Sequence, residues 1–267
     1  MIRALRYTAV GILILLAIAA AVSLAFPISA STQFRDAIDR PPSAAHPLGT
    51  DDLGRDRLAR VLCGLRLSFL LAPAAAVLST MLAALIGGLA GWHGGIVERL
   101  SMAAADLFVS LPWLFLLITV RAVLPLNVSP LVSIAVTFLL LGVLGWAAPA
   151  RVVRARVRVI ARSDYLLQAR AAGASPARLF LRQLVPNLGP VLAAQFWIAV
   201  PVYIIAEANL GLLGLGVSDP LVSLGGMVRE LENEASFFSR PWILAPAVVL
   251  VLAIASVHFA RMAREES

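Results

Sequence analysis

The chain of 267 residues is 60% hydrophobic and only 14% charged, and its mean hydropathy is +0.90. Average soluble domains are about 45–50% apolar and about 25% charged, so this composition excludes an ordinary soluble domain and predicts a membrane protein. All 22 basic residues are arginine, and the formal net charge is +7. Without lysine the chain cannot form the phosphate-binding P-loop. Arginines at the ends of membrane spans explain the charge better than nucleic-acid binding does.

Six stretches are apolar and long enough to cross a membrane, which takes about 20 residues in a helix. They are residues 8–26, 67–91, 102–124, 131–150, 190–212 and 242–260. We therefore predict an all-α, polytopic membrane protein with six transmembrane helices in a single domain over residues 1–267. The first apolar stretch is longer than the core of a cleaved signal peptide, which has about 7–15 residues. We expect it to be an uncleaved anchor.

The distribution of arginine predicts the orientation, because short cytoplasmic loops are rich in Lys and Arg. The run from residue 151 to residue 182 contains eight arginines and a single acid, Asp164. In the segments assigned to the outer side, arginine is mixed with aspartate and glutamate. We therefore place both termini and residues 151–189 in the cytoplasm, and residues 28–66 outside.

The outer segment 28–66 begins with prolines that prevent an early helix. Residues 46–56 then form a motif of small and charged residues. Thr50 or Asp51 is placed to cap a helix whose first turn would favour the acids Asp51 and Asp52. The alternative is a solvated loop that leads into an amphipathic helix at the membrane interface.

Residues 151–189, between the fourth and fifth spans, are predicted to form a helical hairpin. Ser163 is placed to cap a helix that starts at the next residue, and Gly173 follows the end of that helix, where a left-handed backbone is often needed. Ser175-Pro176 is typical of a second helix start, and Pro186 should end that helix. Two hypotheses remain open for this arginine-bearing hairpin: contact with anionic lipid headgroups and docking of a cytoplasmic partner.

Several motifs in sequence order carry a family resemblance over nearly the whole chain. Gln168-Ala169-Arg170-Ala171-Ala172-Gly173-Ala174-Ser175, followed by Pro186-Asn187, resembles the cytoplasmic EAA loop of ABC importer permeases. The other motifs resemble those of the C-type permease subunits of dipeptide, oligopeptide and nickel importers: residues 46–56, the Gly-rich turn at 91–95, Asp106 with Pro112, residues 149–154, Glu207, and residues 213–216 and 225–227. One departure concerns the glutamate that gives the loop its name, because Leu167 stands in its place.

The resemblance implies a type I ABC importer that carries peptides, such as di- or oligopeptides, or a related small solute across the bacterial cytoplasmic (inner) membrane. The implied partners are a second homologous permease, one or two ATPase subunits, an extracytoplasmic solute-binding protein and membrane lipid. ATP and Mg²⁺ would bind to the ATPase subunits, and this chain would bind no cofactor and have no catalytic residue. The ATPase would dock on residues 164–186, with coupling residues Gln168, Ala169, Arg170, Ala172, Gly173, Ala174, Ser175, Arg178 and Pro186.

Three acidic or arginine residues lie within the predicted spans: Asp106, Arg121 and Glu207. Charged side chains in a membrane usually face a partner or a cavity. One hypothesis is structural and pairs Asp106 with an arginine of residues 151–158, and Glu207 with Arg121. The other hypothesis places Glu207 on the transport pathway, where it would face an amine of the substrate.

Two other classes of protein compete with this interpretation. A secondary transporter driven by an ion gradient is the main alternative, although the two halves of the chain show no convincing repeat. A membrane enzyme or a metal site is not expected, because His46, His93 and His258 lack metal-ligand spacing and the chain has no Gly-x-Ser-x-Gly motif. For the glycine-rich and acidic stretch 212–240, a re-entrant element and a solvated connector both remain open.

Overall fold

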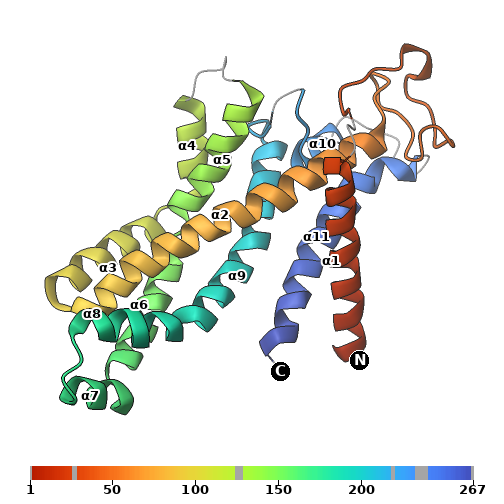
Figure 1. Ribbon diagram of the computed structural model, residues 1–267. Helices are drawn as coiled ribbons and strands as arrows, with labels where there is room; N and C mark the ends of the chain where they lie inside the picture. The colour runs from red at the N-terminus through yellow and green to blue at the C-terminus, as the bar shows by residue number, and fades with distance from the viewer. Residues whose placement is uncertain (1, 26–28, 124–128, 218–219, 232–239, 266–267) are drawn as a thin grey trace. The chain divides into compact units, whose positions relative to one another are not determined.

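The computed structural model describes residues 2–25, 29–123, 129–217, 220–231 and 240–265. Within these ranges the structure contains helices and two isolated bridges but no strand, which confirms the all-α prediction (Figure 1). Five helices are long and apolar enough to cross a membrane, and they correspond to five of the six predicted spans: Tyr7–Ala25, Arg57–His93, Pro130–Ala161, Pro176–Leu212 and Pro241–Ala260.

The main helices are labelled in Figure 1. In chain order they are α1 (Ile2–Ala25), α2 (Arg57–His93), α3 (Gly95–Ser110), α4 (Trp113–Val123), α5 (Pro130–Leu144), α6 (Ala147–Ala161), α7 (Asp164–Ala171), α8 (Pro176–Leu179), α9 (Val185–Leu212), α10 (Leu224–Glu230) and α11 (Ala245–Glu265). Short elements lie between them: the 3-10 helices η1 (Arg35–Ala37) and η4 (Pro241–Leu244), and the π-helix η2 (Phe180–Leu184).

The third predicted span, residues 102–124, is divided into two helices by Pro112. Helix α3 ends at Ser110 and α4 begins at Trp113. The residue before a proline is pushed out of the helical region toward extended backbone, and Leu111 accordingly has φ −79° and ψ 131°. The proline therefore accounts for the interruption in this span.

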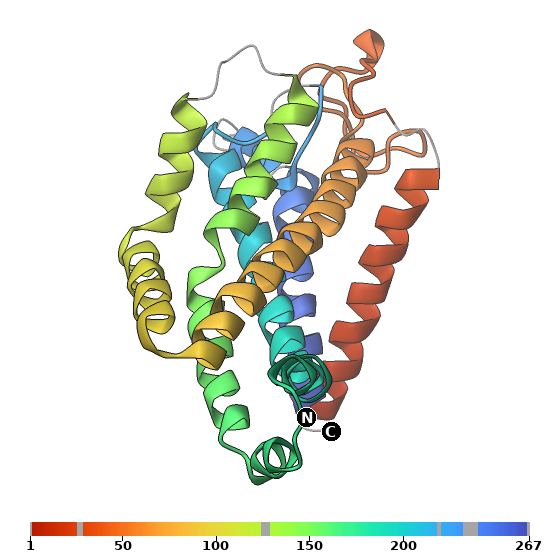
Figure 2. The same ribbon diagram turned by 60° about the vertical axis from the view of Figure 1, so that its left-hand side comes forward.

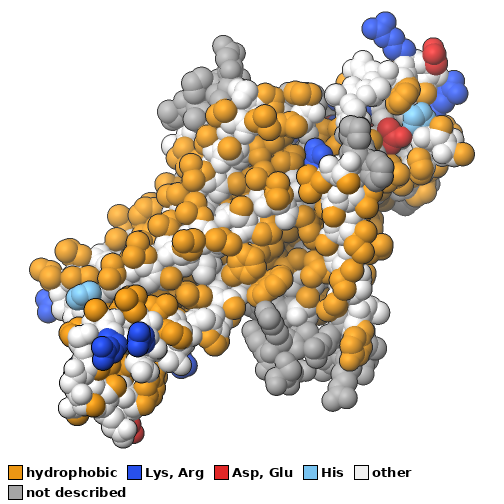
Figure 3. Space-filling view, in the orientation of Figure 1, with side chains coloured by type: hydrophobic (Ala, Val, Ile, Leu, Met, Phe, Trp, Pro, Cys, Tyr) orange, Lys and Arg blue, Asp and Glu red, His pale blue; other side chains and the backbone are white. Residues whose placement is uncertain are grey.

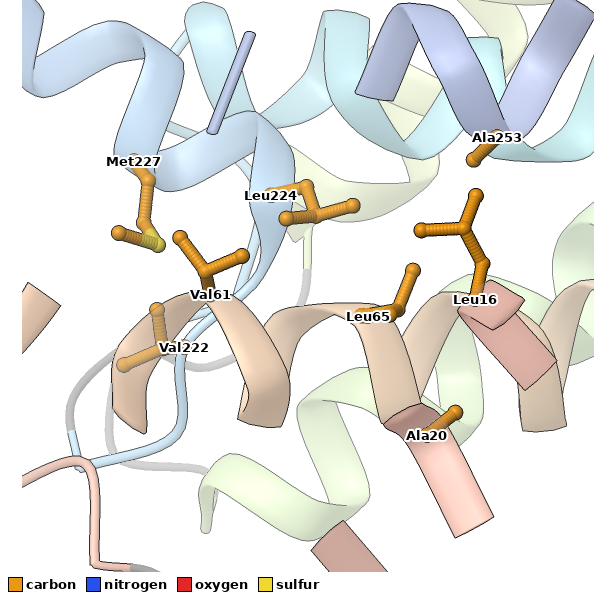
Figure 4. Packing of buried hydrophobic residues seen from close by; sticks show 8 residues of the cluster. All are labelled: Leu16, Ala20, Val61, Leu65, Val222, Leu224, Met227 and Ala253. Carbon is orange, nitrogen blue, oxygen red and sulfur yellow. The ribbon is translucent and has the colours of Figure 1, made fainter. Parts of the chain in front are cut away.

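The structure groups the chain into two compact units, and the first comprises Met1–Pro73, Ile118–Phe138 and Val200–Ser267. In this unit α1 lies beside α11, and α10 also packs on α11. Figure 4 shows the buried side chains that gather between α1, α2, α10 and α11: Leu16, Ala20, Val61, Leu65, Val222, Leu224, Met227 and Ala253. Gly64 allows the close approach of α2 to α10, because a Cβ atom there would lie 2.9 Å from the Leu224 nitrogen.

The outer segment of the first unit folds around a buried carboxylate. Asp51 is 1% exposed and accepts hydrogen bonds from Arg55 Nε at 2.7 Å and from Arg60 at 2.5 Å. Arg60 also pairs with Glu230 of α10 at 2.5 Å. Because buried charges are tolerated only when they are paired, this network fixes the outer segment against α2 and α10.

The prediction that Thr50 or Asp51 caps a helix is wrong. Helix α2 begins only at Arg57, and its cap is Asp56, whose carboxylate accepts a hydrogen bond from the Ala59 backbone N–H at 3.0 Å. The physical reason is that the Asp51 carboxylate is already occupied: it accepts hydrogen bonds from the backbone N–H groups of Leu53 and Arg55 and from the side chains of Arg55 and Arg60, so it does not cap α2.

The second unit comprises Ala74–Leu117 and Leu139–Ala199. In this unit α3 lies beside α6, and Figure 2 shows α6 leading into the α7–α8 region. The C-terminal half of α2 lies so close to α6 at Gly87 and Gly91 that a Cβ atom at either position would collide with the backbone of α6. Small residues spaced four apart are a common device by which membrane helices pack backbone against backbone. The single domain expected over residues 1–267 stays a prediction.

Candidate functional site

The predicted hairpin is present as α7 and α8, joined by a turn at Gly173 (Figure 2). Gly173 has φ +83°, its N–H donates to the Arg170 carbonyl, and the Ala174 N–H donates to the Ala169 carbonyl. These two bonds form the Schellman motif, which favours glycine at the left-handed position. The predicted turn at Gly173 is therefore confirmed.

The starts of the two helices follow the prediction in part. At α8, Ser175 accepts a hydrogen bond from the Arg178 N–H at 3.4 Å and Pro176 is the first helical residue, as predicted. Helix α7 also begins where expected, but the Ser163 hydroxyl does not cap it. That hydroxyl donates instead to the Ile160 carbonyl of α6 at 2.6 Å, because the short connection keeps it within reach of the preceding helix.

The prediction that the second helix ends at Pro186 is wrong. The helical backbone runs on from Pro176 to Leu212, through the π-helix η2 and into α9. A proline in an α-helix clashes with the carbonyl four residues earlier. The wider turn of η2, closed by a bond from the Val185 N–H to the Phe180 carbonyl, precedes Pro186 and accommodates it. The hairpin is thus joined to the fifth span by continuous helix.

Apolar contacts hold the hairpin to α6 and to the end of α2. Leu166 of α7 and Leu179 of α8 are fully buried. In addition, Trp92 of α2 and Phe180 of η2 make an edge-on ring contact with centroids 5.5 Å apart. A cluster of buried side chains from α6, η2 and α9 completes the contact: Val153, Val157, Ile160, Leu184 and Leu188. Close-packed contacts of this kind have low compressibility and transmit strain.

The predicted coupling residues lie mostly on the surface of this hairpin. Ala169 and Ala174 are half-buried, whereas the other seven are exposed: Gln168, Arg170, Ala172, Gly173, Ser175, Arg178 and Pro186. Pro186 lies beyond η2, so it stands apart from the other eight along the helix. Leu167, which stands where the family has glutamate, is 49% exposed. Figure 3 shows arginine side chains over the hairpin, among an otherwise largely hydrophobic surface on the long helices.

The predicted pairing of Asp106 with an arginine of α6 is confirmed. Its carboxylate lies 3.3 Å from the Arg151 guanidinium, and the two side chains are 62% and 52% exposed. Glu207 of α9 is 2% exposed, and neither of its carboxylate oxygens has a hydrogen-bond partner among the described residues. The nearby Ser223 hydroxyl accepts a hydrogen bond from the Gly226 N–H at 3.1 Å, and its own O–H stays available to donate toward Glu207. The side chain of Arg121 lies outside the described residues, so its pairing with Glu207 stays a prediction.

Glu98 of α3, which sequence reasoning missed, accepts hydrogen bonds from two arginines of α6. Its Oε1 atom accepts a hydrogen bond from Arg154 Nε at 2.6 Å and another from Arg158 at 2.8 Å. The hydrogen bond from Arg154, followed by the positive charges of both arginines, lowers the pKa of Glu98 below its ordinary value of 4.5. The only local sequence feature that points to Glu98 is its position in the first turn of α3, just after the glycine turn 94–95. That feature does not identify the two arginines as its partners.

Residues 83–263 match the family described as "Binding-protein-dependent transport system inner membrane component". The chain belongs to this family. It is therefore a multi-pass, non-enzymatic component of the inner membrane. The family match runs from the last turns of α2 to α11 and includes the hairpin.

Curated members of the family are similar to most of the chain. The "Oligopeptide transport system permease protein OppC" of Bacillus subtilis (strain 168) is 35% identical over 206 residues, which cover 77% of this chain and 65% of that protein. The protein of the same name from Mycobacterium tuberculosis (strain ATCC 25618 / H37Rv) is 35% identical over 220 residues, 81% of this chain and 73% of that protein. The "Dipeptide transport system permease protein DppC" of Bacillus subtilis (strain 168) is 33% identical over 190 residues, 71% of this chain and 58% of that protein.

Proposed function

We propose that this chain is a permease subunit of an ATP-driven importer that carries peptides, such as di- or oligopeptides, or a related small solute. The observation that carries the proposal is the α7–α8 hairpin, an exposed pair of short helices joined to the span α9 by unbroken helix. The oligopeptide and dipeptide permeases named among the relatives support the class of cargo. The chain supplies the membrane path, and the energy comes from a separate subunit.

In this proposal the hairpin is the docking element for an ATPase subunit on the cytoplasmic side, and both termini lie on that same side. ATP and Mg²⁺ bind to the ATPase subunits and no cofactor binds to this chain. Docking involves the exposed Leu167 and the guanidinium groups of Arg170 and Arg178. Because a hydrophobic side chain replaces the family glutamate, contact with the ATPase subunit depends on the shape of the hairpin and on these arginines. Coupling requires that the docking free energy differ between the inward- and outward-facing states.

The complete importer contains a second homologous permease, one or two ATPase subunits and an extracytoplasmic solute-binding protein, all surrounded by membrane lipid. The family description, which names binding-protein-dependent transport, supports the last of the protein partners. In this proposal the outer segment around Asp51 and α10 lies on the side from which solute arrives.

The test is purification of the tagged chain from its host membrane in mild detergent, with partners identified by mass spectrometry. We expect a second permease and an ATPase with a P-loop. Replacing Gly173 by proline should remove the ATPase, because proline cannot adopt φ +83°. Replacing Gly173 by asparagine, which tolerates left-handed backbone, should retain it. A chain that purifies alone, with uptake that survives ATP depletion but stops when the ion gradient collapses, would instead establish a secondary transporter.

A further inference from the structure

Glu98 joins α3 to α6 through two arginines. Its Oε1 atom receives Arg154 Nε at 2.6 Å and Arg158 Nη1 at 2.8 Å, and a second nitrogen of Arg154 donates to the same oxygen. The Glu98 side chain is only 14% exposed. Hydrogen bonds between charged groups are the stronger class in proteins, and partial burial protects this group from screening by salt.

A second ion pair joins the same two helices nearer their other ends. Asp106 lies eight residues after Glu98 on α3, and Arg151 lies three residues before Arg154 on α6. These spacings put the paired residues on the facing sides of the two helices. Because the Asp106–Arg151 pair is more than half exposed at both side chains, we expect it to contribute little. Glu98 is therefore the stronger of the two charged links.

Helix α6 also leads directly into the hairpin and packs closely on α2. Val157 and Ile160 belong to the buried cluster that holds η2 and the start of α9. On another side of α6, a Cβ atom at Gly91 of α2 would lie 2.8 Å from both the Arg154 carbonyl oxygen and the Val157 Cβ. The hairpin, α6 and the end of α2 are thus in direct contact within one compact unit. Helix α3 is attached to α6 both by a buried apolar cluster, which includes Ala105 and Ala150, and by the charged link of Glu98.

We propose that Glu98 is a positioning residue for transport: it makes α3 follow α6, so that a displacement of the hairpin reaches the first half of the divided third span. The inference rests on the proposed function, since it presumes that a partner displaces the hairpin. It goes further by assigning the transmission of that movement to a named carboxylate outside the docking element. The two arginines hold Glu98 from adjacent turns of α6, so α3 resists both sliding and rotation against that helix.

The test uses the complete importer, purified with its ATPase, second permease and binding protein and reconstituted into liposomes. Solute uptake and ATP hydrolysis are measured in parallel. In Glu98→Gln, which keeps the shape but removes the charge, we expect ATP hydrolysis to continue and uptake per ATP to fall about fivefold, the lower end of typical coupling effects. The matched control is Arg151→Gln, which removes the exposed pair between the same helices and should leave the ratio unchanged. Equal ratios in the two variants would overturn the proposal.

A second measurement applies even if Glu98→Gln does not assemble. Spin labels are attached to cysteines at the exposed positions Leu100 of α3 and Val159 of α6. The single native cysteine of this chain, Cys63, is replaced by alanine, and the partner subunits are used in cysteine-free form. We expect the distance between the labels to be the same with and without ATP. A distance that changes with ATP would show that the helices move apart and would refute the inference, while ATP-driven uptake by the same complex would leave the proposed function intact.

Discussion

The close contact between α2 and α6 at Gly91 leads to a quantitative prediction for Gly91→Ala. The new Cβ atom would lie 2.8 Å from the Cβ of Val157 and 2.8 Å from the Arg154 carbonyl oxygen. Carbon atoms in contact are normally about 3.5–4.0 Å apart, so α6 would have to retreat by roughly 0.7–1.2 Å. Overpacking of this kind costs about 1–3 kcal/mol.

The neighbouring Gly88→Ala is the matched control, because a Cβ atom there would meet nothing within 4 Å. Both substitutions gain the same helix propensity, about 0.8–1.0 kcal/mol, so the difference between them isolates the packing cost. At about 2–4 °C per kcal/mol for a chain of this size, Gly91→Ala should unfold about 2–12 °C below Gly88→Ala. The assay is thermal unfolding of the purified protein in detergent. Equal unfolding temperatures would refute the close packing of these helices.

Three further predictions concern charged groups. Arg60→Ala should destabilise the fold by about 3 kcal/mol or more in denaturant unfolding, because it leaves the buried Asp51 with one partner fewer. The control is Arg240→Ala, which removes an exposed ion pair with Asp39 and should cost at most about 1 kcal/mol. Because the pKa of Glu98 is lowered in the folded state, its contribution to stability is complete above pH 4.5 and is lost as the pH falls through the folded-state pKa. The stability difference between wild type and Glu98→Gln should therefore shrink on acidification. A stability difference that stays constant down to pH 3 would contradict this. Glu207→Gln should unfold at the wild-type temperature or above, because a buried carboxylate without a described partner is costly; a clear loss of stability would indicate a pairing such as that with Arg121.

The hairpin could be predicted from sequence because its signals are local. Gly173, with its left-handed backbone, and Ser175-Pro176, with its cap, act on residues within one turn of themselves. The apolar spans could also be predicted from the sequence, because length and composition alone decide whether a helix can cross a membrane. The pairing of Asp106 with α6 was also foreseen, since a charge near a membrane boundary needs a partner and that helix is rich in arginine.

The remaining features depend on contacts that no local pattern contains. Glu98 and Arg154 are 56 residues apart in sequence, and only the packing of α3 on α6 brings them together. Asp51 has the residue type of a helix cap, yet the energetic demand of pairing buried charges determines its role. Pro186 has the residue type of a helix terminator, but the π-helix before it provides the space that a proline needs.

That π-helix also fixes the direction in which the hairpin leaves the membrane helix. Its hydrogen bonds span five residues instead of four, so η2 holds one residue more than an α-helical turn in the same place. Each residue of an α-helix corresponds to a rotation of about 100°. Deleting one residue between Phe180 and Leu184 would restore regular helix and swing α7 and α8 by about 100° around the axis of α9. A single residue therefore sets the rotational position of the hairpin around the axis of α9.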